Sequence, residues 1–90
     1  MSTVVPIQNK KVYDKIRAIS NQYRFRILEL TENKTMNISE ISKELKLSYT
    51  KCADYIHILE KENLILKHKE GKEVFISSKI KIQREKIEFI

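Results

Sequence analysis

Two helix-start signals near the middle of the chain, separated by a short turn, constrain its fold more than any other feature. Asn37 precedes an apolar stripe over residues 38–45, and Glu40 follows it by three residues, so this pair predicts a capping box. Ser48 supplies a second N-cap, for a helix over residues 49–62. The pattern therefore predicts a short helix, a three-residue turn and a longer helix in direct succession.

Periodicity also assigns the two faces of the helix expected over residues 49–62. At about 100° per residue, Cys52, Ile56 and Leu59 fall on one side, which is expected to face the core. The opposite face carries Thr50, Asp54, His57 and Lys61. Because Cys52 lies on the apolar stripe, a role in the core is favoured over a redox switch.

Two further helices are expected before this pair. Apolar residues recur at helical spacing over residues 10–19. Ser20 and Asn21 then read as the N-cap of another helix, which ends near residues 31–34. The first two-thirds of the chain is therefore predicted to be mainly helical.

Asn63 stands where a helix needs a closing residue in the left-handed conformation. After it, the apolar residues no longer recur at helical spacing. Residues 64–68 and 73–77 are rich in β-branched and aromatic side chains and predict two strands. Residues 69–72 between them fit a type I turn closed by a left-handed glycine, Gly71. The predicted fold class is mainly α with a small β-hairpin.

The last residues, 79–90, fit two structures. Residues 79–82 alternate apolar and charged side chains as a strand does. Ile80, Ile87 and Ile90 could instead share one face of a short helix. An extra strand is the favoured prediction.

Composition excludes several kinds of site. The chain has 90 residues with one glycine and one cysteine, too few for a phosphate-binding glycine loop, an internal disulfide or a cysteine-based zinc site. No cofactor or metal is expected, and no positioned nucleophile or carboxylate pair indicates an enzyme. No apolar run approaches the roughly 18 residues of a membrane span. We expect one cytoplasmic domain at 9–78, a flexible lead at 1–8 and an extension at 79–90.

Charge is unevenly distributed along the chain, which has a formal net charge of +6. Residues 1–30 carry six basic and two acidic side chains, a net +4, and residues 64–90 carry seven and four, a net +3. Residues 31–63 carry five and six, a net −1. A basic protein favours an anionic partner such as nucleic acid, and here the positions of the lysines matter more than their number.

Several segments carry motifs in a fixed order. Residues 19–28 read ISNQYRFRIL, residues 38–48 read ISEISKELKLS, and residues 59–65 read LEKENLI. They resemble the L-S-N-x-x-R-x-x-I-L, S-x-x-E-L-A-x-x-L-x-L-S and L-x-x-x-G-L-V motifs of archaeal and bacterial ArsR-like regulators, with Asn63 replacing glycine. Gly71 falls where these regulators have the glycine of their wing tip. The resemblance implies a winged helix-turn-helix that binds DNA as a two-fold dimer and acts as a repressor.

The chain departs from that family at two places. Many ArsR-like members sense metals through cysteines in the third helix, and residues 38–45 contain none, so metal sensing is not expected. Many also carry arginine midway along the recognition face, where this chain has Asp54. A DNA sequence preference cannot be transferred from the family for this reason.

A winged helix-turn-helix would place the start of helix 49–62 in the major groove, with Thr50, Lys51 and His57 as candidates for reading base edges. Asp54 could accept a hydrogen bond from cytosine. The hairpin, residues 64–77, would meet flanking backbone or the minor groove. The full set of expected DNA-binding residues is Arg24, Lys46, Ser48, Tyr49, Thr50, Lys51, Asp54, His57, Lys67, Lys69, Gly71 and Lys72.

A homodimer is expected because the first helix and the tail are both apolar, and because the ArsR-like resemblance implies a dimer. The expected dimer-interface residues are Val12, Tyr13, Ile16, Ile87, Phe89 and Ile90. Packing of the same residues within one protomer is the alternative.

The function expected from these features is sequence-specific binding of double-stranded DNA by a nucleoid-associated transcriptional repressor. Two alternatives stay open. The same module could coat DNA from a nucleation site, as in plasmid partition or chromatin. It could also act as an adaptor that binds a further protein partner through its apolar tail.

Overall fold

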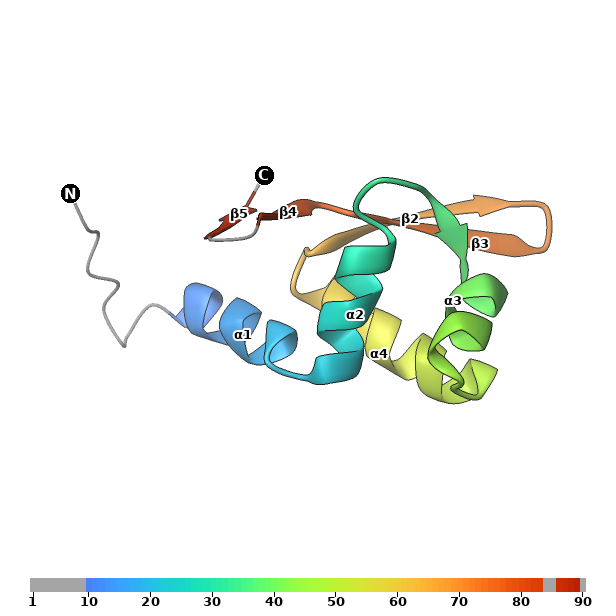
Figure 1. Ribbon diagram of the computed structural model, residues 1–90, viewed down its shortest axis with the longest axis horizontal. Coiled ribbons are helices and arrows are strands. Elements are labelled where there is room, and N and C mark those ends of the chain that lie inside the picture. Colours follow the sequence, from blue (N-terminus) through green and yellow to red (C-terminus); the bar gives the residue numbers. More distant parts are fainter. Residues whose placement is uncertain (1–9, 84–85, 90) are drawn as a thin grey trace.

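The computed structural model describes residues 10–83 and 86–89, and within these ranges the chain forms four helices and five strands. In chain order they are α1 (Lys10–Ile19), α2 (Gln22–Leu30), β1 (Met36–Asn37), α3 (Ile38–Leu45), α4 (Tyr49–Lys61), β2 (Ile65–Glu70), β3 (Glu73–Ser78), β4 (Ile80–Gln83) and β5 (Lys86–Phe89). The helices lie on one side of the strands, and the β2–β3 loop lies at the end of the molecule opposite α1 (Figure 1). None of the described helices is long and apolar enough to cross a membrane.

Helices α2, α3 and α4 begin where the capping signals predicted. Asn21 Oδ1 accepts hydrogen bonds from the backbone N–H groups of Tyr23 at 2.9 Å and Arg24 at 3.0 Å, which starts α2. Asn37 and Glu40 form the reciprocal capping box of α3, with hydrogen bonds of 2.8 and 2.9 Å. These side chains satisfy N–H groups that have no partner inside their helix.

The turn between α3 and α4 is as short as predicted, with one feature that the sequence did not reveal. Lys46 closes α3 in the left-handed region, at φ 56°. The N–H of Leu47 then donates to the carbonyl of Ser42 at 2.9 Å, and Ser48 Oγ accepts from the N–H of Lys51 at 3.1 Å. Because lysine has no special tolerance of positive φ, nothing at this position predicted the left-handed conformation.

The core lies where the helices pack against the strands. Cys52, Ile56 and Leu59 of α4 are fully buried, as the helical period predicted. The buried apolar cluster also includes Ile27, Leu28, Met36, Ile38, Ile41, Leu64, Ile65, Ile76 and Ile80. Contacts from every helix and from the sheet therefore converge on the inner face of α4 and hold its direction.

The hairpin formed by β2 and β3 differs in detail from the prediction. Glu70 pairs with Glu73, so the loop contains only Gly71 and Lys72, and the wider turn expected over residues 69–72 is wrong. Gly71 has a φ of 61°, whereas Lys72 does not have a positive φ. A positive φ at only the first of the two loop residues is typical of a type II′ turn. The sequence did not predict β1, a two-residue strand that pairs antiparallel with β3.

The tail forms strands, as favoured over a helix. β4 pairs antiparallel with β5, and Ile80 at the start of β4 is buried in the core of the domain. The N–H of Ile82 donates to Glu32 Oε1 at 2.6 Å, which ties β4 to the turn after α2. Ile87 and Phe89 lie in β5, and Ile90 lies outside the described residues.

The buried environment of Cys52 predicts that its thiol reacts slowly with disulfide reagents. Its Sγ lies 3.9 Å from the carbonyl oxygen of Ile38, and burial raises the pKa of the thiol to about 11. Such a pKa lowers the thiolate fraction at neutral pH about a hundredfold relative to an ordinary thiol. We expect a chromogenic disulfide reagent to label the native protein at least about a hundredfold more slowly than the guanidinium-unfolded chain. Equal rates would contradict the core assignment of Cys52.

Candidate nucleic-acid interface

The outer face of α4 presents polar side chains to solvent. Thr50, Asp54 and His57 are all exposed, while the opposite face of the helix is buried. The two faces follow from the helical repeat, because the apolar positions of α4 recur every three or four residues. The candidates for reading base edges on this face therefore form one strip along the helix.

The beginning of α4 is electropositive. Its first turn contains no acidic residue, and the helix dipole adds partial positive charge at the same end. Ser48, Tyr49 and Thr50 are exposed there, with Lys46 exposed in the turn just before the helix. The acids of α4 near its other end, Glu60 and the capping residue Glu62, stand about three turns away. The arrangement suits a phosphate or the electronegative edge of a base pair.

The loop of the hairpin lies next to this end of α4. A crevice of about 50 Å³ is lined by Tyr49 of α4, by Lys72 and Glu73 at the hairpin loop, and by the start of α3. Asn37 Nδ2 donates to Glu73 Oε1 at 3.0 Å, which joins the cap of α3 to the first residue of β3. The start of α4 and the β2–β3 loop thus line the same crevice.

The lysines of the hairpin do not all occupy equivalent positions. Lys69 is exposed near the end of β2 and Lys72 is exposed in the loop, and within the described part of the chain neither takes part in a salt bridge. Lys67 Nζ instead lies 3.1 Å from Glu60 Oε1, where it neutralises an acid near the end of α4. Gly71, in the loop itself, is exposed. Lys69 and Lys72 are consequently the hairpin cations best placed for an external anion.

Arg24 is half-buried and donates hydrogen bonds to two carbonyl groups. Its Nε donates to the carbonyl of Ala18 at 2.6 Å and its Nη2 to that of Arg17 at 3.4 Å, both at the end of α1. The guanidinium also lies 5.7 Å from the ring centroid of Tyr55 on α4. Arg24 thus joins α1, α2 and α4.

Arg24, Lys51 and two tyrosines, Tyr23 and Tyr55, form a cluster. Lys51 Nζ lies 5.1 Å from the ring centroid of Tyr55, and Tyr23 stacks on Tyr55 with centroids 5.6 Å apart and an interplanar angle of 18°. Sequence reasoning did not include either tyrosine in a site. The four-residue spacing of Lys51 and Tyr55 was the available signal, because such residues are neighbours on a helix.

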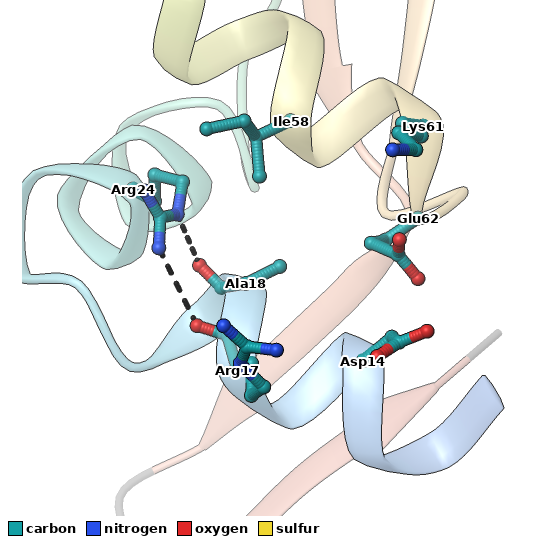
Figure 2. Close-up of a pocket in the computed structure, with 7 residues that line it drawn as sticks. All are labelled: Asp14, Arg17, Ala18, Arg24, Ile58, Lys61 and Glu62. Carbon is teal, nitrogen blue, oxygen red and sulfur yellow. Dashed lines mark hydrogen bonds between the residues drawn. The ribbon is translucent and has the colours of Figure 1, made fainter. Parts of the chain in front are cut away.

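A larger hollow lies between α1, the start of α2 and the end of α4 (Figure 2). Its volume is about 550 Å³, and it is lined by Asp14, Arg17, Ala18, Arg24, Ile58, Lys61 and Glu62. Lys15 Nζ donates to the carbonyl of Glu62 beside it. Side chains of both charges line the hollow, so it does not select an anion or a cation by charge alone.

The residues expected at a dimer interface have different environments. Tyr13 is 54% exposed and Ile16 is 53% exposed on α1, whereas Val12 is half-buried. The guanidinium of Arg17 lies 5.8 Å from the centroid of the Tyr13 ring. The exposed apolar part of α1 therefore consists of Tyr13 and Ile16.

Within the described residues, no group of three or more histidine, cysteine, aspartate or glutamate side chains is arranged to hold a metal ion. His57 is exposed on α4, and His68 lies on β2, where its Nε2 is 3.6 Å from Glu70 Oε2. The two histidines lie on different elements of the fold.

Helices that pack on one face of an antiparallel hairpin, with a capped short helix leading into a longer exposed one, define a winged helix-turn-helix. The family model described as winged helix-turn-helix matches residues 19–81. The chain therefore belongs to the winged helix-turn-helix family, and the predicted fold class is confirmed.

Solved structures with the same fold support this assignment. HlyU from Vibrio cholerae is 23% identical, with a TM-score of 0.76 over 82% of this chain and 80% of that one. The transcriptional regulator HlyU from Vibrio vulnificus is 22% identical, with a TM-score of 0.69 over 79% of this chain and 74% of that one. No curated protein matches the chain significantly.

A third solved structure is relevant to the resemblance to ArsR-like regulators. The homodimeric winged helix-turn-helix DNA-binding domain Mb0332 from Mycobacterium bovis, described as a possible ArsR-family transcriptional regulator, is 17% identical. Its TM-score is 0.74, over 87% of this chain and 75% of that chain. The expected resemblance to ArsR-like regulators is thus confirmed at the level of the fold.

Proposed function

We propose that this protein binds double-stranded DNA sequence-specifically and acts as a dimeric transcriptional repressor. Its α4 would enter the major groove, and the β2–β3 hairpin would contact flanking backbone or the minor groove. The observation that carries the proposal is the acid-free start of α4 lying beside the hairpin loop with its lysines. A repressor of this kind would occlude a promoter by occupying its operator.

The contacts divide by chemistry. Exposed Thr50, Asp54 and His57 can reach base edges, which carry the sequence information. Lys46, Lys69 and Lys72 can meet phosphates, which position the protein without reading sequence. The start of α4 contributes backbone N–H groups as well, since a helix N-terminus favours a phosphate.

Dimerisation would pair the exposed apolar part of α1, Tyr13 and Ile16, with the same surface of a second copy. The homodimeric Mb0332 domain supports this arrangement by analogy of fold. In such a dimer the two α4 helices would enter successive major grooves, about 34 Å apart along a palindromic site.

DNA reading by α4 is tested with Thr50→Ala. On the tightest duplex selected from a random-sequence pool, we expect this variant to lose about 1 kcal/mol of binding free energy, roughly fivefold in Kd. Thr35→Ala removes the same hydroxyl and methyl groups from an exposed loop before β1 and should bind as the parent does. Kd is measured by gel shift in a salt titration.

The outcome of that experiment separates the candidate functions. If the parent protein binds no duplex even at low salt, the proposal is contradicted, and the protein–protein adaptor is the candidate function that remains. Binding that ignores sequence, with a footprint that lengthens as protein is added, identifies a DNA-coating protein instead. A fixed footprint supports a repressor.

The hairpin contact is tested at Gly71. A Cβ on this residue would meet no atom within 4 Å, but φ +61° strains any β-branched side chain. We expect Gly71→Val to weaken DNA binding while the thermal unfolding of the helical core changes little. Gly71→Asn is the matched control, because asparagine tolerates this conformation and should retain affinity. Unchanged affinity in Gly71→Val would mean that the hairpin loop does not contact DNA.

The dimer surface is tested with Ile16→Lys. A buried charge at a two-fold contact lacks a partner, so we expect this variant to sediment as a monomer. Leu66→Lys is the control, because Leu66 is 55% exposed on β2, comparable to the 53% of Ile16 on α1. If the Ile16→Lys variant still forms dimers at the protein concentration at which the parent does, the interface lies elsewhere.

A further inference from the structure

We propose that Lys51 and Arg24, positioned on the ring of Tyr55, form a binding site for a DNA backbone phosphate at the edge of α4 opposite the hairpin. This site deepens the proposed function and rests on it. It also gives Lys51 a different role from the base-reading one that the sequence suggested.

The cluster places two cations on a single aromatic ring. Lys51 Nζ and the Arg24 guanidinium lie 5.1 and 5.7 Å from the centroid of Tyr55, both within the range of a cation–π contact. Tyr23 stacks on the same ring and helps to fix its orientation. The ring thus restricts where two otherwise flexible cationic side chains can lie.

Arg24 retains capacity for an anion. A guanidinium has five N–H donors, and the hydrogen bonds to the carbonyls of Ala18 and Arg17 account for donors on Nε and Nη2 (Figure 2). These bonds hold the group in place at the end of α1. Its remaining donors match the geometry of phosphate oxygens.

The two charges are not neutralised within the protein. Among the described residues, neither Arg24 nor Lys51 takes part in a salt bridge, although Lys67 and Arg26 each do. Like charges that share one ring repel each other, and an anion that contacts both would remove the repulsion. A phosphate supplies that charge together with several acceptor oxygens.

The position of the cluster on α4 matches the shape of a major groove. At about 100° per residue, Lys51 and Tyr55 lie to one side of the exposed strip that contains Thr50 and Asp54. Tyr49 lies to the other side, where it lines the crevice that includes Lys72 of the hairpin. A helix in the major groove is bordered by the phosphates of both strands, so the hairpin and this cluster would each hold one border.

The salt dependence of binding distinguishes a phosphate contact from a base contact. We expect Lys51→Gln to reduce the slope of log K against log salt by about one, because one fewer counterion is released. Affinity should fall by the same factor, roughly eightfold at about 0.1 M salt, on the selected duplex and on one of shuffled sequence. Lys81→Gln removes the same charge from an exposed position on β4 and should leave the slope unchanged.

The positioning role of Tyr55 is tested with a pair of variants. Tyr55→Leu removes the ring but leaves both cations, and we expect a roughly threefold loss of affinity on both duplexes. Tyr55→Phe keeps the ring and should restore affinity and salt slope to those of the parent. Thermal unfolding of both variants establishes that they are folded.

Two results would overturn this site while leaving the proposed function intact. In the first, the parent protein binds DNA, and the Lys51→Gln variant shows the same slope of log K against log salt as the parent. The second is a Lys51→Gln variant that loses preference at one base pair only, which would make Lys51 a base reader. A parent that binds neither duplex overturns the proposed function itself.

Discussion

The three-residue turn between α3 and α4 is the constraint on which the candidate interface depends. Lys46 closes α3 in the left-handed conformation, and Ser48 opens α4 two residues later by capping the N–H of Lys51. A turn this short allows little freedom in the angle between the helices, and the burial of Cys52 and Ile56 removes most of what remains. Which side chains of α4 face outward is therefore decided at the turn and in the core.

Charge placement explains how a nearly neutral middle segment can form a basic surface. Asp54 lies midway along α4, and Glu60 lies toward the far end, where it is paired with Lys67 of β2. The start of the same helix carries no acid and lies beside the lysine-bearing hairpin loop. Opposite charges are thus separated along one helix by about three turns, a distance over which salt largely screens their interaction. The net charge of the segment hides this separation.

Much of the fold was predictable because its signals are local. The capping box of Asn37 and Glu40, the N-cap Ser48 and the left-handed Asn63 each act through hydrogen bonds or dihedral angles within a few residues. β1 could not be predicted, because a two-residue strand exists only through its pairing with β3. The tight loop at Gly71 likewise follows from the register of β2 against β3, which a short motif does not specify.

The sequence by itself determined the helices, their caps, the buried stripe of α4 and the exposed strip around Thr50, because hydrophobic period and capping depend only on near neighbours. The tertiary structure alone decided which charges are available to a partner. It paired Lys67 of β2 with Glu60 of α4 and brought Arg24 of α2 to the ring of Tyr55 on α4. These contacts join different elements of the fold, so they depend on how helices and strands pack rather than on any local pattern.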